Sequence, residues 1–121
     1  MIGEVQCILF VEELARSRQF YARVLQQEPL LDVPGMVQFG LGSGCVLGLM
    51  PRSGAQRLGL QPAPEGYRQE LYLRVDDPEV WWSRALQAGA REVLPLEPRN
   101  WGDRAAYGLD PDGHLLVLAS C

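Results

Sequence analysis

The histidine of this chain, His114, lies in the stretch WGDRAAYGLDPDGHLLVL (101–118), which also holds three aspartates and a tryptophan. Histidine and carboxylates are the side chains that bind divalent metals and transfer protons in catalysis. The same residues also fit an ordinary turn and strand. Proline sets φ, aspartate bonds nearby backbone N–H groups and glycine tolerates positive φ, so DPDG (110–113) predicts a tight turn. We therefore expect these two aspartates to shape the turn rather than to perform chemistry.

The composition limits the classes of protein to which this chain can belong. The chain has 121 residues, of which 47% are apolar, and this is enough for one small domain with its own core. Its net charge of −4 argues against a nucleic-acid partner, because the phosphate backbone attracts a basic surface. The sequence has neither an apolar run of about 18 residues nor a secretory signal pattern. We therefore expect a cytoplasmic protein without a membrane partner.

The cysteines do not indicate a disulfide framework or a metal site. Cys7, Cys45 and Cys121 stand far apart without a CxxC pair, and their number is odd. This pattern argues against a disulfide framework and against a structural zinc site. We expect Cys7 and Cys45 to be buried apolar residues.

Apolar periodicity predicts the order strand, helix and three strands, twice along the chain. The segment 51–66 holds three prolines and three glycines and predicts a linker between the two halves. Helices are expected from about 14 to 25 and from 78 to 88. Strands are expected at 5–11, 28–33, 36–41, 45–50, 69–75, 91–96, 104–109 and 114–119.

The apolar residues of the two predicted helices form stripes that can face a sheet. The first stripe consists of Leu14, Phe20, Tyr21, Val24 and Leu25, and the second of Val80, Trp81, Ala85 and Leu86. One of Trp81 and Trp82 is expected in the core and the other against a neighbour or a partner chain.

These elements predict an α+β fold that covers residues 1–121 as a single domain. It consists of two βαβββ modules, at about 1–50 and 67–121, related by a period of about 64 residues. Neither half has enough apolar residues to be stable alone. We expect their small sheets to join into one curved mixed sheet around a groove, with the helices on the outer face.

Three stretches carry a resemblance to a known family. VQCILFVEELARSRQFYARVLQ, LYLRVDDPEVWWSRALQAGA and NWGDRAAYGLDPDGHLLVLAS resemble the vicinal oxygen chelate superfamily, which includes glyoxalase I, extradiol dioxygenases, fosfomycin-modifying enzymes and bleomycin resistance proteins. The resemblance covers nearly the whole chain and implies the paired βαβββ fold. It is specific for the superfamily and not for one activity within it.

The resemblance also implies four positions for metal ligands, at Gln6, Gly48, Glu70 and Val117, where metal-dependent members carry histidines and glutamates. Glu70 could bind a metal strongly and Gln6 weakly, whereas the other two offer no side-chain donor. We therefore expect no metal and no other cofactor, and a chain closest to the metal-free, bleomycin-resistance-like members. His114 precedes the last position by three residues, so strand alternation turns its side chain to the helix-covered face.

Strand alternation predicts which side chains line the groove. Glu70, Tyr72 and Arg74 share one face of their strand, and Trp101 follows in a glycine-flanked loop where it either stacks on a flat ligand or anchors the loop. Glu70 has an alternative role as the salt-bridge partner of Arg74 or Arg104. The predicted ligand-binding residues are Gln6, Phe10, Glu70, Tyr72, Arg74, Trp101, Arg104 and Val117.

Two classes of function stay open. In the first, a homodimer without metal sequesters a planar, often cationic compound between aromatic and acidic residues. In the second, the chain is an enzyme of the same superfamily, of the lyase, isomerase or dioxygenase type. It would use either displaced metal ligands or Glu70 as a general base, with Arg74 or Arg104 holding an anion. The residues name neither the small molecule nor a catalytic group.

Overall fold

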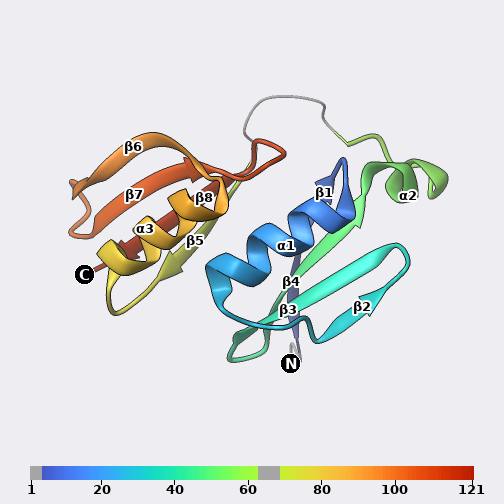
Figure 1. The fold of residues 1–121 in the computed structure, drawn as a ribbon, viewed down its shortest axis with the longest axis horizontal. Coiled ribbons are helices and arrows are strands. Elements are labelled where there is room, and N and C mark those ends of the chain that lie inside the picture. Colours follow the sequence, from blue (N-terminus) through green and yellow to red (C-terminus); the bar gives the residue numbers. More distant parts are fainter. Residues whose placement is uncertain (1–3, 63–68) are drawn as a thin grey trace. The chain divides into compact units, whose positions relative to one another are not determined.

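A computed structural model describes residues 4–62 and 69–121 of the chain. The chain divides into two compact units, Met1–Pro64 and Glu65–Cys121, and each has its own four-stranded sheet (Figure 1). The α+β class and the repeated βαβββ order are confirmed. The joining of the two sheets around a common groove within a single domain stays a prediction.

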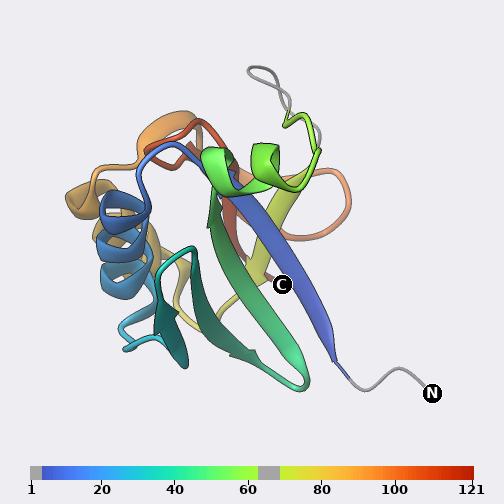
Figure 2. The ribbon, with the colours of Figure 1, turned by 90° about the vertical axis from the view of Figure 1, so that its right-hand side faces the viewer.

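The first unit is a mixed sheet with the spatial order β1-β4-β3-β2. Its first and last strands pair in parallel, and the other pairs are antiparallel. The helix α1 lies on one face of this sheet (Figure 2). The elements are β1 (Val5–Val11), α1 (Leu14–Leu25), β2 (Leu31–Val33), β3 (Met36–Gly42) and β4 (Cys45–Pro51).

The apolar stripe of α1 packs on β3 and β4 as predicted. Phe20, Tyr21, Val24 and Leu25 are buried, and the rings of Phe20 and Tyr21 meet edge to face with centroids 4.9 Å apart. The inward residues of β4 complete this core on the sheet side. The helix ends at Leu25, because the following Gln26 has a left-handed φ of 54° that stops further helical hydrogen bonding.

Part of the predicted linker 51–66 is helical. Residues Arg52–Arg57 form a short helix, α2, which begins after the extended Pro51 and buries Ala55. The sequence RSGAQR has neither proline nor β-branched residues, and its one glycine, Gly54, does not prevent a short helix. Residues 63–66 of the predicted linker lie outside the described residues.

The second unit repeats the first with the order β5-β8-β7-β6, and β5 again pairs in parallel with the last strand. The helix α3 covers one face of this sheet (Figure 1). The elements are β5 (Glu70–Arg74), α3 (Pro78–Ala88), β6 (Arg91–Pro98), β7 (Arg104–Leu109) and β8 (Leu115–Ser120).

The predicted stripe of α3 is wrong in part. Trp82 and Ala85 are buried, whereas Val80 and Leu86 are 51% and 40% exposed. The physical reason lies on β7, where a Cβ on Gly108 would come within 2.9 Å of the Trp82 ring. The bare glycine therefore leaves the space that the indole fills. Trp81 lies half-buried at the surface, with the guanidinium of Arg84 4.6 Å from its ring centroid.

The DPDG segment forms the predicted turn before β8. Asp110 Oδ1 accepts hydrogen bonds from the backbone N–H groups of Asp112 and His114, both at 2.9 Å, and Gly113 has φ of +87°. Asp110 is only 2% exposed. His114 therefore belongs to the turn, and the strand begins one residue later than predicted.

The cysteine prediction is partly wrong, because Cys45 is exposed at the start of β4. Cys7 is half-buried, and burial raises the pKa of its thiol. In the described part of the chain, the helices are too short or too polar to cross a membrane.

The contact between Gly108 and Trp82 predicts a mutational effect. We expect Gly108→Ala to lower the free energy of unfolding by about 1–3 kcal/mol, because the new methyl group would press on the buried indole and would lie 3.3 Å from the carbonyl oxygen of Arg91. Urea unfolding measures the change.

Gly54→Ala in α2 is the matched control. Its Cβ would meet nothing closer than Met50 at 3.8 Å, and alanine favours helix, so stability should stay equal or rise by up to about 1 kcal/mol. Equal stabilities for the two variants would contradict the proposed packing of Trp82.

Candidate functional site

The face of the second sheet opposite α3 carries both polar and aromatic side chains. Tyr72 of β5 lies beside Val117 of β8 in the parallel register, and both pack with Ala105 and Ala119. Tyr107 of β7 joins the same cluster. Strand alternation places Glu70 and Arg74 on the face of Tyr72, as the sequence predicted.

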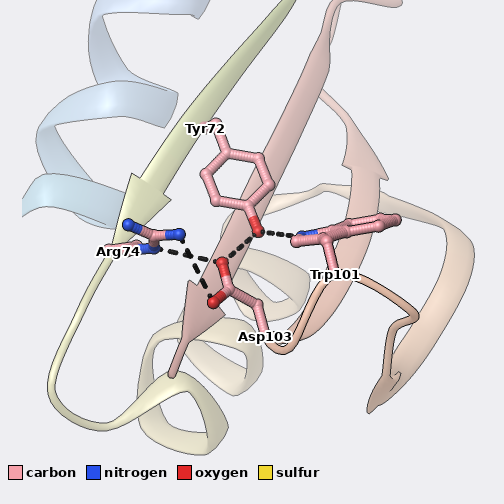
Figure 3. Close-up of polar contacts among 4 residues, drawn as sticks. All are labelled: Tyr72, Arg74, Trp101 and Asp103. Atoms are coloured by element: carbon pink, nitrogen blue, oxygen red, sulfur yellow. Dashed lines mark hydrogen bonds and ion pairs between the residues drawn. The ribbon is translucent and has the colours of Figure 1, made fainter.

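Four residues form a hydrogen-bonded network at one end of this face (Figure 3). The Tyr72 hydroxyl donates to Asp103 Oδ2 at 2.6 Å, and Trp101 Nε1 donates to the Tyr72 hydroxyl at 3.0 Å. Arg74 donates through Nε to Asp103 Oδ2 at 3.1 Å and through Nη2 to Oδ1 at 3.4 Å. Asp103 is thus the acceptor on which two side chains of β5 converge.

The turn between β6 and β7 places Trp101 and Asp103. The backbone N–H of Arg99 donates to the carbonyl of Asp103 at 2.7 Å, and that of Gly102 donates to the carbonyl of Arg99 at 3.2 Å. Gly102 has φ of +105°, a conformation that other residues rarely adopt. The turn leaves Asp103 4% exposed and Trp101 53% exposed.

The network shifts the pKa values of its members. The hydrogen bond from Tyr72, followed by the guanidinium of Arg74, lowers the pKa of Asp103 despite its burial. Burial raises the pKa of Tyr72, and its bond to the Asp103 carboxylate raises it further. The carboxylate also raises the pKa of Arg74. Around neutral pH, Asp103 is therefore an ionised acceptor beside a neutral tyrosine and a charged arginine.

Asp103 was not among the predicted ligand-binding residues. The signal in the sequence was the position of an aspartate directly before a predicted strand, two residues after the tryptophan of a glycine-flanked loop. Periodicity along the strands does not reveal its partners, because Tyr72 and Arg74 precede it by 31 and 29 residues.

Glu70 lies exposed on the same face, near Tyr107. Burial raises the pKa of the Tyr107 hydroxyl, and the negative charge of Glu70 adds to this shift. Arg99 stands with its guanidinium 5.7 Å from the Tyr107 ring centroid and donates to the carbonyl of Ala105. Tyr107 is therefore close to the exposed carboxylate of Glu70 and to a guanidinium that backbone carbonyls hold.

Arg104 is not brought together with the network. Its guanidinium pairs with Glu79 of α3, which lowers the pKa of that carboxyl, so the side chain lies toward the helix. The predicted alternative of a salt bridge from Glu70 to Arg74 or Arg104 is wrong, because these arginines pair with Asp103 and Glu79. Strand periodicity did not predict Asp103 and Glu79 as partners, because Asp103 lies in a turn and Glu79 on a helix.

Gln6 and Phe10 belong to the first unit, on the sheet face opposite α1. Gln6 accepts from Gln38 Nε2 at 3.2 Å and donates to Glu4 at 2.8 Å, and Phe10 is half-buried. The structure thus places these two predicted residues in one unit and the other six in the second.

The positions implied for metal ligands do not fit a divalent cation. A side chain at Gly48 would meet Ile8 Cγ1 at 3.1 Å, and Val117 is completely buried in the apolar cluster. Within residues 4–62 and 69–121, no three histidine, cysteine, aspartate or glutamate side chains gather as a metal site would require.

The comparisons with known proteins agree with the fold. Residues 3–118 match the model of the Glyoxalase/Bleomycin resistance protein/Dioxygenase superfamily, and the chain belongs to this family. A glyoxalase-related enzyme from Fulvimarina pelagi has a similar structure, with a TM-score of 0.85 and 21% identity over 97% of this chain and 86% of that one. A family enzyme from Burkholderia phytofirmans has a TM-score of 0.85 and 17% identity over 95% of both chains.

Curated relatives match a shorter stretch. An uncharacterized protein of Mycobacterium bovis is 46% identical over 44 residues, which are 36% of this chain and 29% of the relative. An uncharacterized protein of Mycobacterium tuberculosis matches equally over 26% of its length. The match therefore spans less than a third of these relatives.

The lowered pKa of Asp103 predicts a pH dependence of stability. Its folded pKa lies below the ordinary 3.8, so its stabilising contribution is present above that value and is lost as pH falls through the folded pKa. We expect Tyr72→Phe to be less stable than the wild type at pH 7, and the difference to shrink below about pH 4. Urea unfolding from pH 7 to pH 2.5 measures it.

Tyr107→Phe serves as the control, since this hydroxyl lies on the same face and burial and the charge of Glu70, rather than a hydrogen bond to a carboxylate, raise its pKa. Its stability difference from the wild type should stay constant across the acid range. A pH-independent difference for Tyr72→Phe as well would contradict the assigned role of the Asp103 carboxylate.

Proposed function

We propose that this chain is a binding protein that sequesters a small, planar, cationic aromatic molecule without altering it. The observation that carries the proposal is the indole of Trp101, which is 53% exposed beside the sheet face of Tyr72 and Glu70. An exposed aromatic ring that is held by a hydrogen bond offers a flat surface on which another ring can stack.

The charges on this face favour a cation. Arg74 and Asp103 compensate each other within the network. Glu70 adds a carboxylate on the same face, and the register places Glu97 there too, opposite Ala105. Arg99 contributes one positive charge that backbone carbonyls already bind. A planar cation would therefore gain both from the carboxylates and from the ring face of Trp101.

Membership of the family supports this proposal, because its description includes bleomycin resistance proteins beside enzymes. The enzymatic alternative uses Glu70 as a general base with an arginine that holds an anion. It is the weaker one, because Arg74 and Arg104 are both paired with carboxylates and Glu70 is exposed. Turnover of a bound compound would revive it.

We also infer a homodimer in the cytoplasm. The cysteines at 7, 45 and 121 are free thiols, which suits a reducing compartment. Leu58 and Leu60, which follow α2, are 69% and 47% exposed, and apolar side chains of this kind favour contact with a second copy.

The binding proposal predicts that ethidium, a planar aromatic cation, binds and that Trp101→Leu and Glu70→Gln each weaken the binding. We expect the affinity for ethidium to fall roughly threefold to thirtyfold. Trp101→Leu removes the contact of the cation with an aromatic ring, which contributes about 0.5–2 kcal/mol. Glu70→Gln removes a carboxylate that attracts the cation. Isothermal titration calorimetry measures the affinity, and an anionic planar dye of similar size tests the sign of the charge.

Glu92→Gln is the matched control, since it removes the same charge from the same sheet. Glu92 lies opposite Gly108, on the face that α3 covers. Its affinity for ethidium should equal that of the wild type. Equal losses for Glu92→Gln and Glu70→Gln, or stronger binding of the anionic dye, would reject the proposed site.

The dimer proposal predicts about twice the mass of one chain in sedimentation velocity at micromolar concentration. The double variant Leu58→Glu/Leu60→Glu should sediment as a monomer, because it places charges on the exposed apolar pair. A monomeric wild type would refute the dimer. A dimeric double variant would exclude this surface as the interface.

A further inference from the structure

The hydrogen bonds around Trp101 have a fixed direction. The indole Nε1–H can only donate, so the Tyr72 oxygen must accept from it at 3.0 Å. The single hydroxyl proton of Tyr72 must then point elsewhere, and it is donated to Asp103 Oδ2 at 2.6 Å. The orientation of the Tyr72 lone pairs toward Trp101 therefore depends on the acceptor at Asp103 (Figure 3).

Asp103 is suited to be that acceptor. An ionised carboxylate only accepts, and here it takes the hydroxyl of Tyr72 and both contacts of Arg74. An asparagine at this position would offer one oxygen for three donors, and its NH₂ group would face either Tyr72 or Arg74. The neutral isostere thus cannot keep all three bonds.

Asp103 itself is 4% exposed, whereas the ring of Trp101 is 53% exposed. A ligand would therefore touch the indole and not the carboxylate. We infer that Asp103 is a positioning residue, which holds the exposed indole of Trp101 through the Tyr72 hydroxyl as a preformed stacking surface. This inference rests on the proposed binding of a planar cation at Trp101.

Preformation has a measurable consequence for binding. A loop tryptophan without a fixed contact samples several rotamers, and a ligand that stacks on it must order it. The bond from Trp101 to Tyr72 orders the ring before the ligand arrives. Loss of Asp103 should therefore weaken binding only as long as Trp101 is present.

The test without ligand uses ¹H–¹⁵N spectra of the tryptophan indole groups. Trp101→Phe identifies the Trp101 signal by its disappearance. We expect Asp103→Asn and Tyr72→Phe each to move the Trp101 indole proton upfield and to speed its exchange with water roughly threefold to tenfold, the effect of losing one hydrogen bond. The double variant should show no more than either single variant, because both break one chain of bonds.

Asp110→Asn is the matched control. This aspartate is equally buried in the same unit and holds the turn between β7 and β8, at the other end of β7. It should lower the melting temperature and leave the Trp101 signal unchanged. An unshifted Trp101 signal in Asp103→Asn, or equal shifts in Asp103→Asn and Asp110→Asn, would overturn the positioning role.

A second variant serves if Asp103→Asn does not fold. Asp103→Glu keeps the charge beside Arg74 but displaces the carboxylate from Tyr72, so the Trp101 signal should shift here as well. A folded Asp103→Glu with the wild-type signal would overturn the inference.

The affinity for ethidium separates this inference from the proposed function. Asp103→Glu, which keeps the charge beside Arg74, should weaken binding roughly threefold to tenfold in the wild-type background and have no effect in Trp101→Leu. If ethidium and the anionic dye both fail to bind while the indole signal shifts, the positioning of Trp101 stands and the proposed ligand class fails. If Trp101→Leu loses binding while a folded Asp103→Glu binds like the wild type, the inference fails and the proposed function stands.

Discussion

In both units the first strand pairs in parallel with the last, β1 with β4 and β5 with β8. Parallel neighbours require a crossover, and each unit supplies a helix that covers one face of its sheet. The inward side chains of that face form the core with the helix, and every second residue is left for the opposite face. The chemistry of the second unit follows from this arrangement, since Tyr72 and Arg74 stand on the uncovered face of β5 while Leu71 and Leu73 alternate with them.

The candidate site shows how a buried charge is accommodated on such a face. Asp103 is almost fully buried, which is unfavourable for an ionised carboxylate unless donors compensate it. Tyr72 and Arg74 provide these donors, and the same hydroxyl binds the indole of Trp101. One carboxylate therefore ties the turn between β6 and β7 to the edge strand β5, two segments that are distant in the sequence. The hydrogen bonds to Asp103 therefore both stabilise the fold and position the exposed indole of Trp101.

Membership of the Glyoxalase/Bleomycin resistance protein/Dioxygenase superfamily leaves the activity open, because the family description joins enzymes with resistance proteins. Our proposal of a binding protein rests on the residues of the chain. Gly48 and Val117 offer no donor where the resemblance implies metal ligands, and the arginines suited to hold an anion are paired. The exposed indole of Trp101 and the carboxylates of Glu70 and Glu97 on one sheet face are the basis on which we propose the binding of a flat cation.

The sequence alone determined the repeated βαβββ order, the DPDG turn and the shared face of Glu70, Tyr72 and Arg74. These features depend on local periodicity and turn chemistry, which neighbouring residues define. Only the tertiary structure decided that Trp82 rather than Trp81 enters the core, because this depends on the space above Gly108 on another strand. The tertiary structure likewise decided that Arg104 turns to Glu79 and that Asp103 joins Tyr72, Arg74 and Trp101. Such contacts join residues about 25 to 31 positions apart. The strand period predicts which face a side chain occupies but not which distant partner it contacts there.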